Sequence, residues 1–402
     1  MKIILMLGLI LCAVVHAGSD IGPYINVLES QGEDPLQFTL KKLDTFDLLI
    51  FDDALHNAAE PFAFYRALIS DQAFYTKAKY VFVEAFSIDQ QRDIDQYLTT
   101  LPEDTLLLLP VFQNDYSGTG WNAQTYLDLL RMIYRINREL PAADRLEVVA
   151  VSNPFYWEAI RSPEDLEIAR KSLTGRDYFM YRIIADRLDH FRSGRRGIFL
   201  TNTRHAYKGI KDHEGHFYWN TGTFFHQWHP GKTYSIRFHN VNLYIAAAVP
   251  DDSLVYKTTA GMEKMRYSWV RMDNGNWDRA FRAHGNKPLA VPLADNPFGK
   301  TPYIGNHMLD VSDGQTMHDA YDAVIFLAPI EVLHKTATFD FIYTPGFRRE
   351  LERRYRILYT PEQIESELTG HGVQSLPELF DRLFVSQPKE IHSLSRSIAP
   401  LE

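Results

Sequence analysis

The sequence predicts an α/β fold with a mainly parallel central sheet flanked by helices and a helical C-terminal appendage. Short apolar runs alternate with amphipathic helical patterns along most of the chain, as in strand–helix–strand units. The runs are continuously apolar, which is typical of parallel strands buried on both faces. The last part of the chain, residues 346–402, shows helical patterns and a polar tail.

The clearest unit lies between residues 46 and 84. The run Leu48-Leu49-Ile50-Phe51 has the length and composition of a buried strand and stops at Asp52-Asp53. A helical pattern follows, and a second apolar run, 80–83, ends on Glu84. We expect these two strands to be neighbours. Asp53, His56 and Glu84 would then lie at the carboxyl edge of the sheet, where open α/β sheets bind ligands.

The remaining elements follow the same alternation. We predict helices over residues 88–98, 121–140 and 163–191, and strands over residues 105–112, 146–151, 197–201, 233–238, 243–249 and 323–327. The segment 251–317 is rich in Gly, Asn and Pro, so we expect irregular loops or a small lobe over the sheet edge. The predicted division is a leader at 1–17, an α/β domain at 18–345 and a helical segment at 346–402.

The first residues resemble a signal peptide. Lys2 supplies a positive charge, residues 3–15 are apolar, and Val15-His16-Ala17 fits a cleavage site. Cys12, the single cysteine, lies within this leader and follows Leu11, whereas lipidation would require a small residue there. We therefore expect an exported protein, periplasmic or secreted, cleaved near Ala17 and free of cysteine. No later segment is apolar and long enough to be a transmembrane segment.

The composition and net charge limit the classes of partner that the protein is expected to bind. The 402-residue chain is 45% hydrophobic, enough for a large core, and carries a formal net charge of -9. This acidic balance argues against a general nucleic-acid binder, which needs a basic face. We expect a small-molecule substrate, and the sequence leaves the oligomeric state open.

The first chemical constellation is Asp53-x-x-His56, with Glu60 and Arg66 on the following helix and Glu84 on the next strand. A carboxylate beside a histidine fixes its tautomer and raises its basicity, as a general base for water requires. Two carboxylates and a histidine could equally bind a divalent metal. In the alternative interpretation, Asp53 caps the helix and His56 is an ordinary turn residue.

A second constellation follows the predicted strand 197–201. His205 comes just after it and would share the sheet edge with His56, either for acid–base roles or for binding a metal together with Glu84. Upstream, Arg176 and Asp177 are expected to pair with each other, bracing a helix or lying on the surface.

Histidines are also dense between residues 205 and 239. We interpret most of them as scattered surface or core residues, because short motifs of this kind are weak indicators: His205, His213, His216, His226, His229 and His239. The chain contains no GxGxxG, P-loop or G-x-S-x-G motif.

Several stretches resemble the erythromycin esterase family. The run DDALHNAAEPFAFYRALI…YVFVEAFSIDQQRDIDQYL is similar to its N-terminal core, and RDYFMYRIIADRLDHFRSGRRGIFLTNTRHAYKG to its Arg-Asp-x-x-Met helix and the strand that follows. TGTFFHQWHPGKTYSIRF and DAVIFL are similar to a later helix–strand pair and to the last strand. The resemblance spans roughly residues 40–330 in consistent order.

The resemblance implies that His56, Glu84 and His205 occupy the family's catalytic positions, with Arg66 near its substrate-side arginine. In that family a histidine activates water to hydrolyse an ester, without an obligatory metal. This chain departs from the pattern at three positions: Asp53 replaces Glu, Asn57 replaces Gly, and Asn202 replaces the first His of a His-x-x-His pair. The wider superfamily also contains ChaN-like haem-binding lipoproteins, so fold alone does not fix function.

The resulting prediction is an exported, esterase-like hydrolase. His56 or His205 would be the general base, Glu84 and Asp53 would orient it, and the substrate-side residues would include Glu60, Arg66, Asn202 and Arg204, with Arg66 or Arg204 stabilising the oxyanion. No cofactor is favoured. One alternative is a non-catalytic metal- or haem-binding protein that uses the same cleft. Another is a metal-dependent hydrolase with His56, Glu84 and His205 as ligands.

Overall fold

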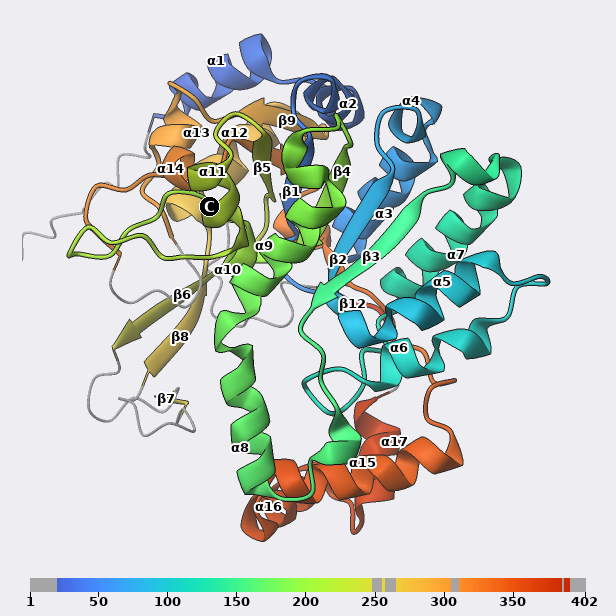
Figure 1. Cartoon of the computed structure of the whole chain (residues 1–402). Coiled ribbons are helices and arrows are strands. Elements are labelled where there is room, and N and C mark those ends of the chain that lie inside the picture. Colours follow the sequence, from blue (N-terminus) through green and yellow to red (C-terminus); the bar gives the residue numbers. More distant parts are fainter. Residues whose placement is uncertain (1–19, 248–254, 257–264, 305–310, 385–386, 391–402) are drawn as a thin grey trace, which may run out of the picture.

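The computed structural model describes residues 20–247, 255–256, 265–304, 311–384 and 387–390. A seven-stranded sheet lies at its centre, in the order β3-β2-β4-β1-β5-β10-β9 (Figure 1). Neighbouring strands are parallel except β9 and β10. The α/β prediction is therefore confirmed. The strands are β1 Leu48–Asp52, β2 Tyr80–Ser87, β3 Glu147–Ser152, β4 Gly197–Thr201, β5 Thr233–Phe238, β9 Leu289–Pro292 and β10 Ala323–Phe326.

Helices cover both faces of the sheet, and successive residues of β1 show this directly. Leu49 and Phe51 belong to one buried cluster together with residues of the helices α3, α5 and α7, whereas Leu48 and Ile50 belong to a second cluster with residues of α9, α11 and α12. Burial on both sides explains why the strand reads as a continuous apolar run. The bounds of these helices are α3 Ala59–Ser70, α5 Gln91–Thr99, α7 Gln124–Glu139, α9 Arg176–Arg187, α11 Thr221–Trp228 and α12 Asn276–Ala283.

The strand order places the point where the crossovers change direction near the centre of the sheet. From β1 the chain crosses to β2 in one direction, and from β4 it crosses to β5 in the other. Strand β4 therefore lies between β1 and β2, and the expectation that those two strands are neighbours is wrong. Ligands of open α/β sheets bind where the crossovers diverge in this way. The short helix α10, Thr203–Ala206, leaves β4 at that point.

Two expected strands differ in the structure. Residues 105–112 form a 3-10 turn, Thr105–Leu108, and the helix α6, Leu109–Gln113. The Asp104 side chain accepts the Leu106 N–H at 3.0 Å, and Pro110 occupies the first turn, where its missing N–H costs nothing. The apolar run therefore forms a helical segment that buries Leu108, Val111 and Phe112 and leaves Leu106 exposed.

The second difference concerns residues 243–249. Strand β6, Asn242–Ala247, lies outside the main sheet and pairs with β8, Met265–Val270, which also pairs with β7, Val255–Tyr256. Residues 248 and 249 lie outside the described residues. This small antiparallel sheet stands apart from the main sheet in Figure 1. The part of 251–317 that follows returns to the main body as α12, β9 and α13.

The remaining segments complete the body and its C-terminal appendage. The predicted helix 163–191 is divided by a 3-10 turn at Ser172–Gly175 into α8 and α9. The C-terminal helices α15, α16 and α17 lie with α8 at one end of the molecule (Figure 1). The expected leader lies outside the described residues, and no described helix has the length and apolarity needed to cross a membrane. The other elements are α1 Gly22–Gln31, α2 Pro35–Thr45, α4 Gln72–Tyr75, α8 Pro163–Lys171, α13 Pro297–Lys300, α14 Met317–Ala320, α15 Pro345–Leu358, α16 Pro361–His371, α17 Leu376–Leu383, β11 His334–Lys335 and β12 Lys389–Glu390.

Candidate active site

A cavity of about 240 Å³ opens at the carboxyl edge of β1, β4 and β2. The pairing of β2 with β4 ends at Val83, and its pairing with β3 shifts register before Ser87, so Glu84 lies at an irregularity of the strand. Such bulges recur next to active sites, because they redirect a side chain. The lining residues come from five separate segments of the chain: Ala54, Leu55, His56, Tyr116, Arg176, Asn202, Arg204, His205 and Trp269.

His56 lies between two acidic groups. Its Nδ1 is 3.3 Å from Asp53 Oδ2, and its Nε2 is 3.5 Å from Glu84 Oε2 and contacts the Asn202 amide nitrogen. Asn202 is the N-cap of α10, and its Oδ1 accepts the Arg204 N–H at 3.0 Å. This bond turns the NH2 group of Asn202 toward His56. Nδ1 of His56 therefore donates to Asp53, while Nε2 presents its lone pair.

The turn that carries His56 includes a residue with positive φ. Asn57 has a φ of 67°, in the left-handed region that glycine adopts most readily and asparagine next. Asparagine is therefore compatible with this backbone turn. The rings of Trp121 and His56 pack nearly perpendicular to each other, with 5.4 Å between their centroids.

Burial and charge act in opposite directions on His56. Burial alone would lower its pKa, but the carboxylates of Asp53 and Glu84 outweigh that effect and raise the pKa above that of an ordinary histidine, against partial opposition from Arg176. Burial raises the pKa of Asp53, and the neighbouring His56 reduces that rise.

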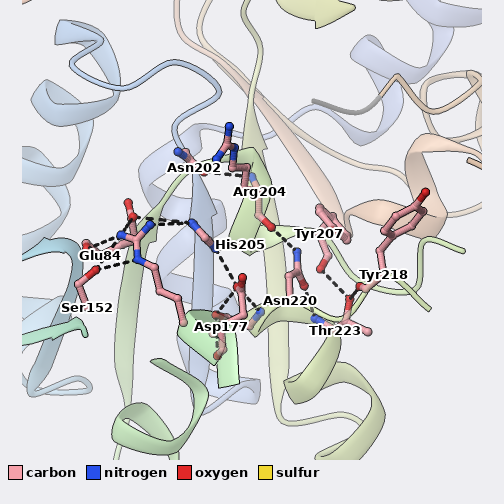
Figure 2. Close-up of polar contacts among 12 residues, drawn as sticks. Glu84, Ser152, Asp177, Asn202, Arg204, His205, Tyr207, Tyr218, Asn220 and Thr223 are labelled. Atoms are coloured by element: carbon pink, nitrogen blue, oxygen red, sulfur yellow. Dashed lines mark hydrogen bonds and ion pairs between the residues drawn. The ribbon is translucent and has the colours of Figure 1, made fainter. Parts of the chain in front are cut away.

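His205 forms a second carboxylate–imidazole pair. Its Nδ1 is 2.8 Å from Asp177 Oδ1, which also accepts the N–H and hydroxyl of Thr221 at 2.8 and 2.9 Å (Figure 2). Burial raises the pKa of Asp177, but His205 and Thr221 outweigh it and lower the pKa. Nε2 of His205 faces Glu84 Oε1 at 3.7 Å and Arg176 Nη1 at 3.4 Å.

The guanidinium group of Arg176 lies between the two histidine–carboxylate pairs and contacts Glu84. It donates to the Ser152 hydroxyl from Nε at 2.9 Å and from Nη2 at 2.7 Å, and lies 5.0 Å from the Tyr116 ring centroid. Although burial raises the pKa of Glu84, Arg176, His56 and His205 together lower it to about 2. Glu84 is therefore a buried, ionised carboxylate held between a guanidinium and two histidines.

His56, Glu84 and His205, the ligands of the metal-dependent alternative, surround a guanidinium group. Among the described residues, no group of three or more His, Cys, Asp and Glu side chains is arranged to hold a metal ion. Arg176 contacts Glu84 and lies within hydrogen-bond range of His205, so a guanidinium charge already occupies the space between two of the three proposed ligands. A second cation there would be repelled.

The other histidines of the 205–239 region lie at separate places. His213 and His216 are exposed, and His226 lines a different cavity with Lys208. His229 contacts the Tyr181 hydroxyl at 2.9 Å, and His239 is buried against Asp278 at 3.1 Å. They do not converge on the cavity that contains His56.

Two predicted substrate-side residues lie elsewhere. Arg66 lines a surface cavity between α3 and α7 together with Arg131 and Arg135. Glu60 accepts the backbone N–H of His334 at 3.1 Å. The structure thus brings together His56, Glu84, His205, Asp53, Asn202 and Arg204, but places Arg66 and Glu60 outside the cavity lining.

Sequence reasoning missed the roles of Arg176 and Asp177. It expected them to pair with each other, whereas consecutive helical residues point about 100° apart and here reach different partners. Both residues open α9, the last α-helix before strand β4.

Comparison with known proteins gives structural neighbours only. No family model and no curated protein matches the chain. The solved structures that resemble it include a Bacillus cereus protein (12% identity, TM-score 0.49, 77% of this chain and 97% of that chain), a succinoglycan biosynthesis protein (9%, 0.49, 76% and 96%) and a mutant of erythromycin esterase EreC in its open conformation (11%, 0.47, 76% and 95%). The similar structures therefore include an erythromycin esterase, from the family that the sequence resembles.

Proposed function

We propose that this protein is an ester hydrolase that activates water with His56 and needs no metal. The observation that carries the proposal is the set of contacts made by the two ring nitrogens of His56. Its Nδ1 is held by buried Asp53, and its Nε2 presents a lone pair beside ionised Glu84 at the cavity. A general base needs an imidazole in this form.

The proposed reaction uses groups that line the cavity or lie next to it. A water molecule takes the place of the Asn202 amide at Nε2 and gives its proton to His56 as its oxygen bonds to the ester carbonyl carbon. Asp53 stabilises the imidazolium, and the guanidinium groups of Arg204 and Arg176 stabilise the oxyanion. The carbonyl then reforms, the bond to the alcohol oxygen breaks, and the imidazolium returns the proton to that oxygen. The products are an acid and an alcohol.

The size of the cavity limits what it encloses. A volume of about 240 Å³ is below the roughly 300–1,000 Å³ of sites that enclose a drug-sized ligand. We infer that the cavity takes the ester end of a substrate.

Export, proposed from the leader-like residues 1–17, is tested by N-terminal sequencing of the protein recovered from the extracytoplasmic fraction. A mature chain beginning near Gly18 is the expected result.

The central test is hydrolysis of a panel of p-nitrophenyl and alkyl esters. His56→Ala should reduce kcat/KM by about 10²–10⁴-fold, as loss of a general base does, while circular dichroism and thermal unfolding stay unchanged. His371→Ala is the matched control: this histidine also lies beside a carboxylate, Glu367 at 3.6 Å, but on the exposed face of α16. If His56→Ala hydrolyses the esters as fast as the control, or no ester is a substrate, the proposal is wrong.

A further inference from the structure

Three arginine side chains line a surface cavity that the proposed mechanism leaves unused. This cavity has a volume of about 500 Å³ and lies between α3 and α7. It is lined by Arg66, Ala67, Ser70, Asp128, Arg131, Met132 and Arg135. None of these residues lines the cavity that contains His56, so the two sites are separate.

The packing of the two helices determines where the α3 arginine lies. The rings of Phe62 in α3 and Tyr126 in α7 are 4.5 Å apart between centroids, and about two turns further along α3 the Ser70 hydroxyl donates to the Met132 sulfur at 3.1 Å. Arg66 is four residues from both Phe62 and Ser70, so it belongs to the same stripe of α3. Arg66 therefore lies at the seam where α3 and α7 meet.

The other two arginines border the same seam from α7. Arg131 and Arg135 are four residues apart, so they are neighbours on the surface of that helix. Met132, which contacts Ser70, follows one of them directly and precedes the other by three residues. Two arginines of one helix and one of the other thus surround a single cavity, although the whole chain carries a formal net charge of -9.

The protein balances the positive charge of this cavity only in part. Arg131 Nε lies 3.5 Å from a carboxylate oxygen of Glu103. Arg66 and Arg135 have no ion pair and no side-chain hydrogen bond with any residue that the structure describes. Asp128 is the acidic residue of the lining, so three guanidinium groups are set against one carboxylate.

Guanidinium groups around a cavity suit a tetrahedral oxyanion. Their planar N–H forks donate bidentate hydrogen bonds to phosphate, and such charge-assisted bonds are roughly twice as strong as neutral ones. An anion there would also reduce the repulsion among the three like charges. We propose that this cavity binds a phosphate group, with Arg66, Arg131 and Arg135 as the donors.

Asp128 gives the proposed site a means of choosing between oxyanions. Its Oδ1 accepts the Gln124 amide at 2.7 Å, and its Oδ2 has no direct partner within the described part of the chain. At about pH 6 phosphate carries a P–OH group that can donate to this oxygen, whereas sulfate has no such donor. The carboxylate would only repel sulfate. The site should therefore prefer phosphate to sulfate.

The test is isothermal titration calorimetry of the purified protein with inorganic phosphate at about pH 6, with the ionic strength held constant by chloride. Saturable binding is expected. Arg66→Met and Arg135→Met should each weaken it by about 10–100-fold, as loss of a hydrogen bond to a charged group does. Arg349→Met is the matched control, because Arg349 is an exposed arginine of a different helix, α15, and should leave the affinity unchanged. Thermal unfolding of each variant checks that the fold is retained.

Two further ligands define the specificity of the site. Sulfate should bind the wild type at least about tenfold more weakly than phosphate, and Asp128→Asn should reduce this difference, because an amide nitrogen can donate to sulfate. Glycerol 3-phosphate distinguishes the source of the phosphate group. Binding tighter than that of inorganic phosphate would identify a phosphorylated small molecule as the ligand, and weaker binding would identify the free ion.

This inference is independent of ester hydrolysis, because the calorimetric measurement involves neither His56 nor an ester. Three results would overturn it. They are the absence of saturable phosphate binding, an equal affinity of wild type, Arg66→Met and Arg135→Met for phosphate, and an equal affinity of the wild type for phosphate and sulfate.

Discussion

Replacing Arg176 by methionine tests the charge arrangement of the site. The Arg176 side chain is 14% exposed and that of Glu84 is 4% exposed, so the pair is largely shielded from solvent. The pKa of Glu84 falls from 4.5 to about 2, which corresponds to roughly 3 kcal/mol of folding stability at neutral pH. Arg176 is the largest of the groups that lower it. We therefore expect Arg176→Met to lose roughly 3 kcal/mol, in line with breaking a buried ion pair.

The pH dependence gives a second check on the same variant. Because the folded pKa of Glu84 lies below its unfolded value, its contribution is fully present above about pH 4.5 and is lost as the pH falls toward about 2. In Arg176→Met the pKa is no longer lowered to this extent. The difference in unfolding free energy between wild type and variant should therefore shrink across that window in urea denaturation followed by circular dichroism.

Two comparison variants make the result decisive. Arg182→Met removes an exposed pair on the same helix, 3.9 Å from Asp186, and should cost less than about 0.5 kcal/mol. Adding Glu84→Gln to Arg176→Met removes the uncompensated charge and should restore most of the lost stability. If Arg176→Met costs no more than Arg182→Met, or Glu84→Gln restores nothing, the assigned ion pair does not stabilise the fold as reasoned.

Other predictions concern pH, metal and packing. Because the pKa of His56 is raised and a base must be neutral, ester hydrolysis should increase with pH around a midpoint above that of an ordinary histidine; a midpoint below it, measured as kcat/KM, would contradict this. Prolonged dialysis against EDTA should leave the hydrolysis rate unchanged, whereas a loss restored by a divalent metal would favour the metal-dependent alternative. Arg237→Met should lower the unfolding free energy by roughly 3–5 kcal/mol, because it leaves fully buried Asp52 without its cation, and a loss under 1 kcal/mol would speak against that role. Gly299→Ala should destabilise, since the added Cβ would overlap a backbone carbonyl oxygen, whereas Gly370→Ala in α16 meets no atom and should stabilise by about 0.5–1 kcal/mol; thermal unfolding compares the two.

The sequence predicted most elements because their signals are local. An apolar run followed by a helical pattern is enough to place β1 and α3, and polar residues at the expected strand ends marked Asp53, Glu84 and His205 as site candidates, although β2 continues past Glu84 to Ser87. The same local reasoning failed at 105–112, because a short apolar run is compatible with either a strand or a short helix.

The tertiary structure decided which of those residues meet. The order of β2, β4 and β1 depends on pairing between segments more than 100 residues apart, which no local periodicity reports. That order inserts β4 between the other two strands and brings His205 to Glu84. The start of α9, which precedes β4, places Arg176 against Glu84 and Asp177 against His205, whereas Arg66 lines a different surface cavity.

By itself, then, the sequence determined the class of fold, the strand ends and the types of chemical group available, since these depend on residue composition and short-range spacing. The charge state of the site was decided only by folding. A carboxylate becomes a strongly acidic, buried Glu84, and a histidine becomes a more basic His56, because the fold removes water and places specific charges within a few ångströms of each other.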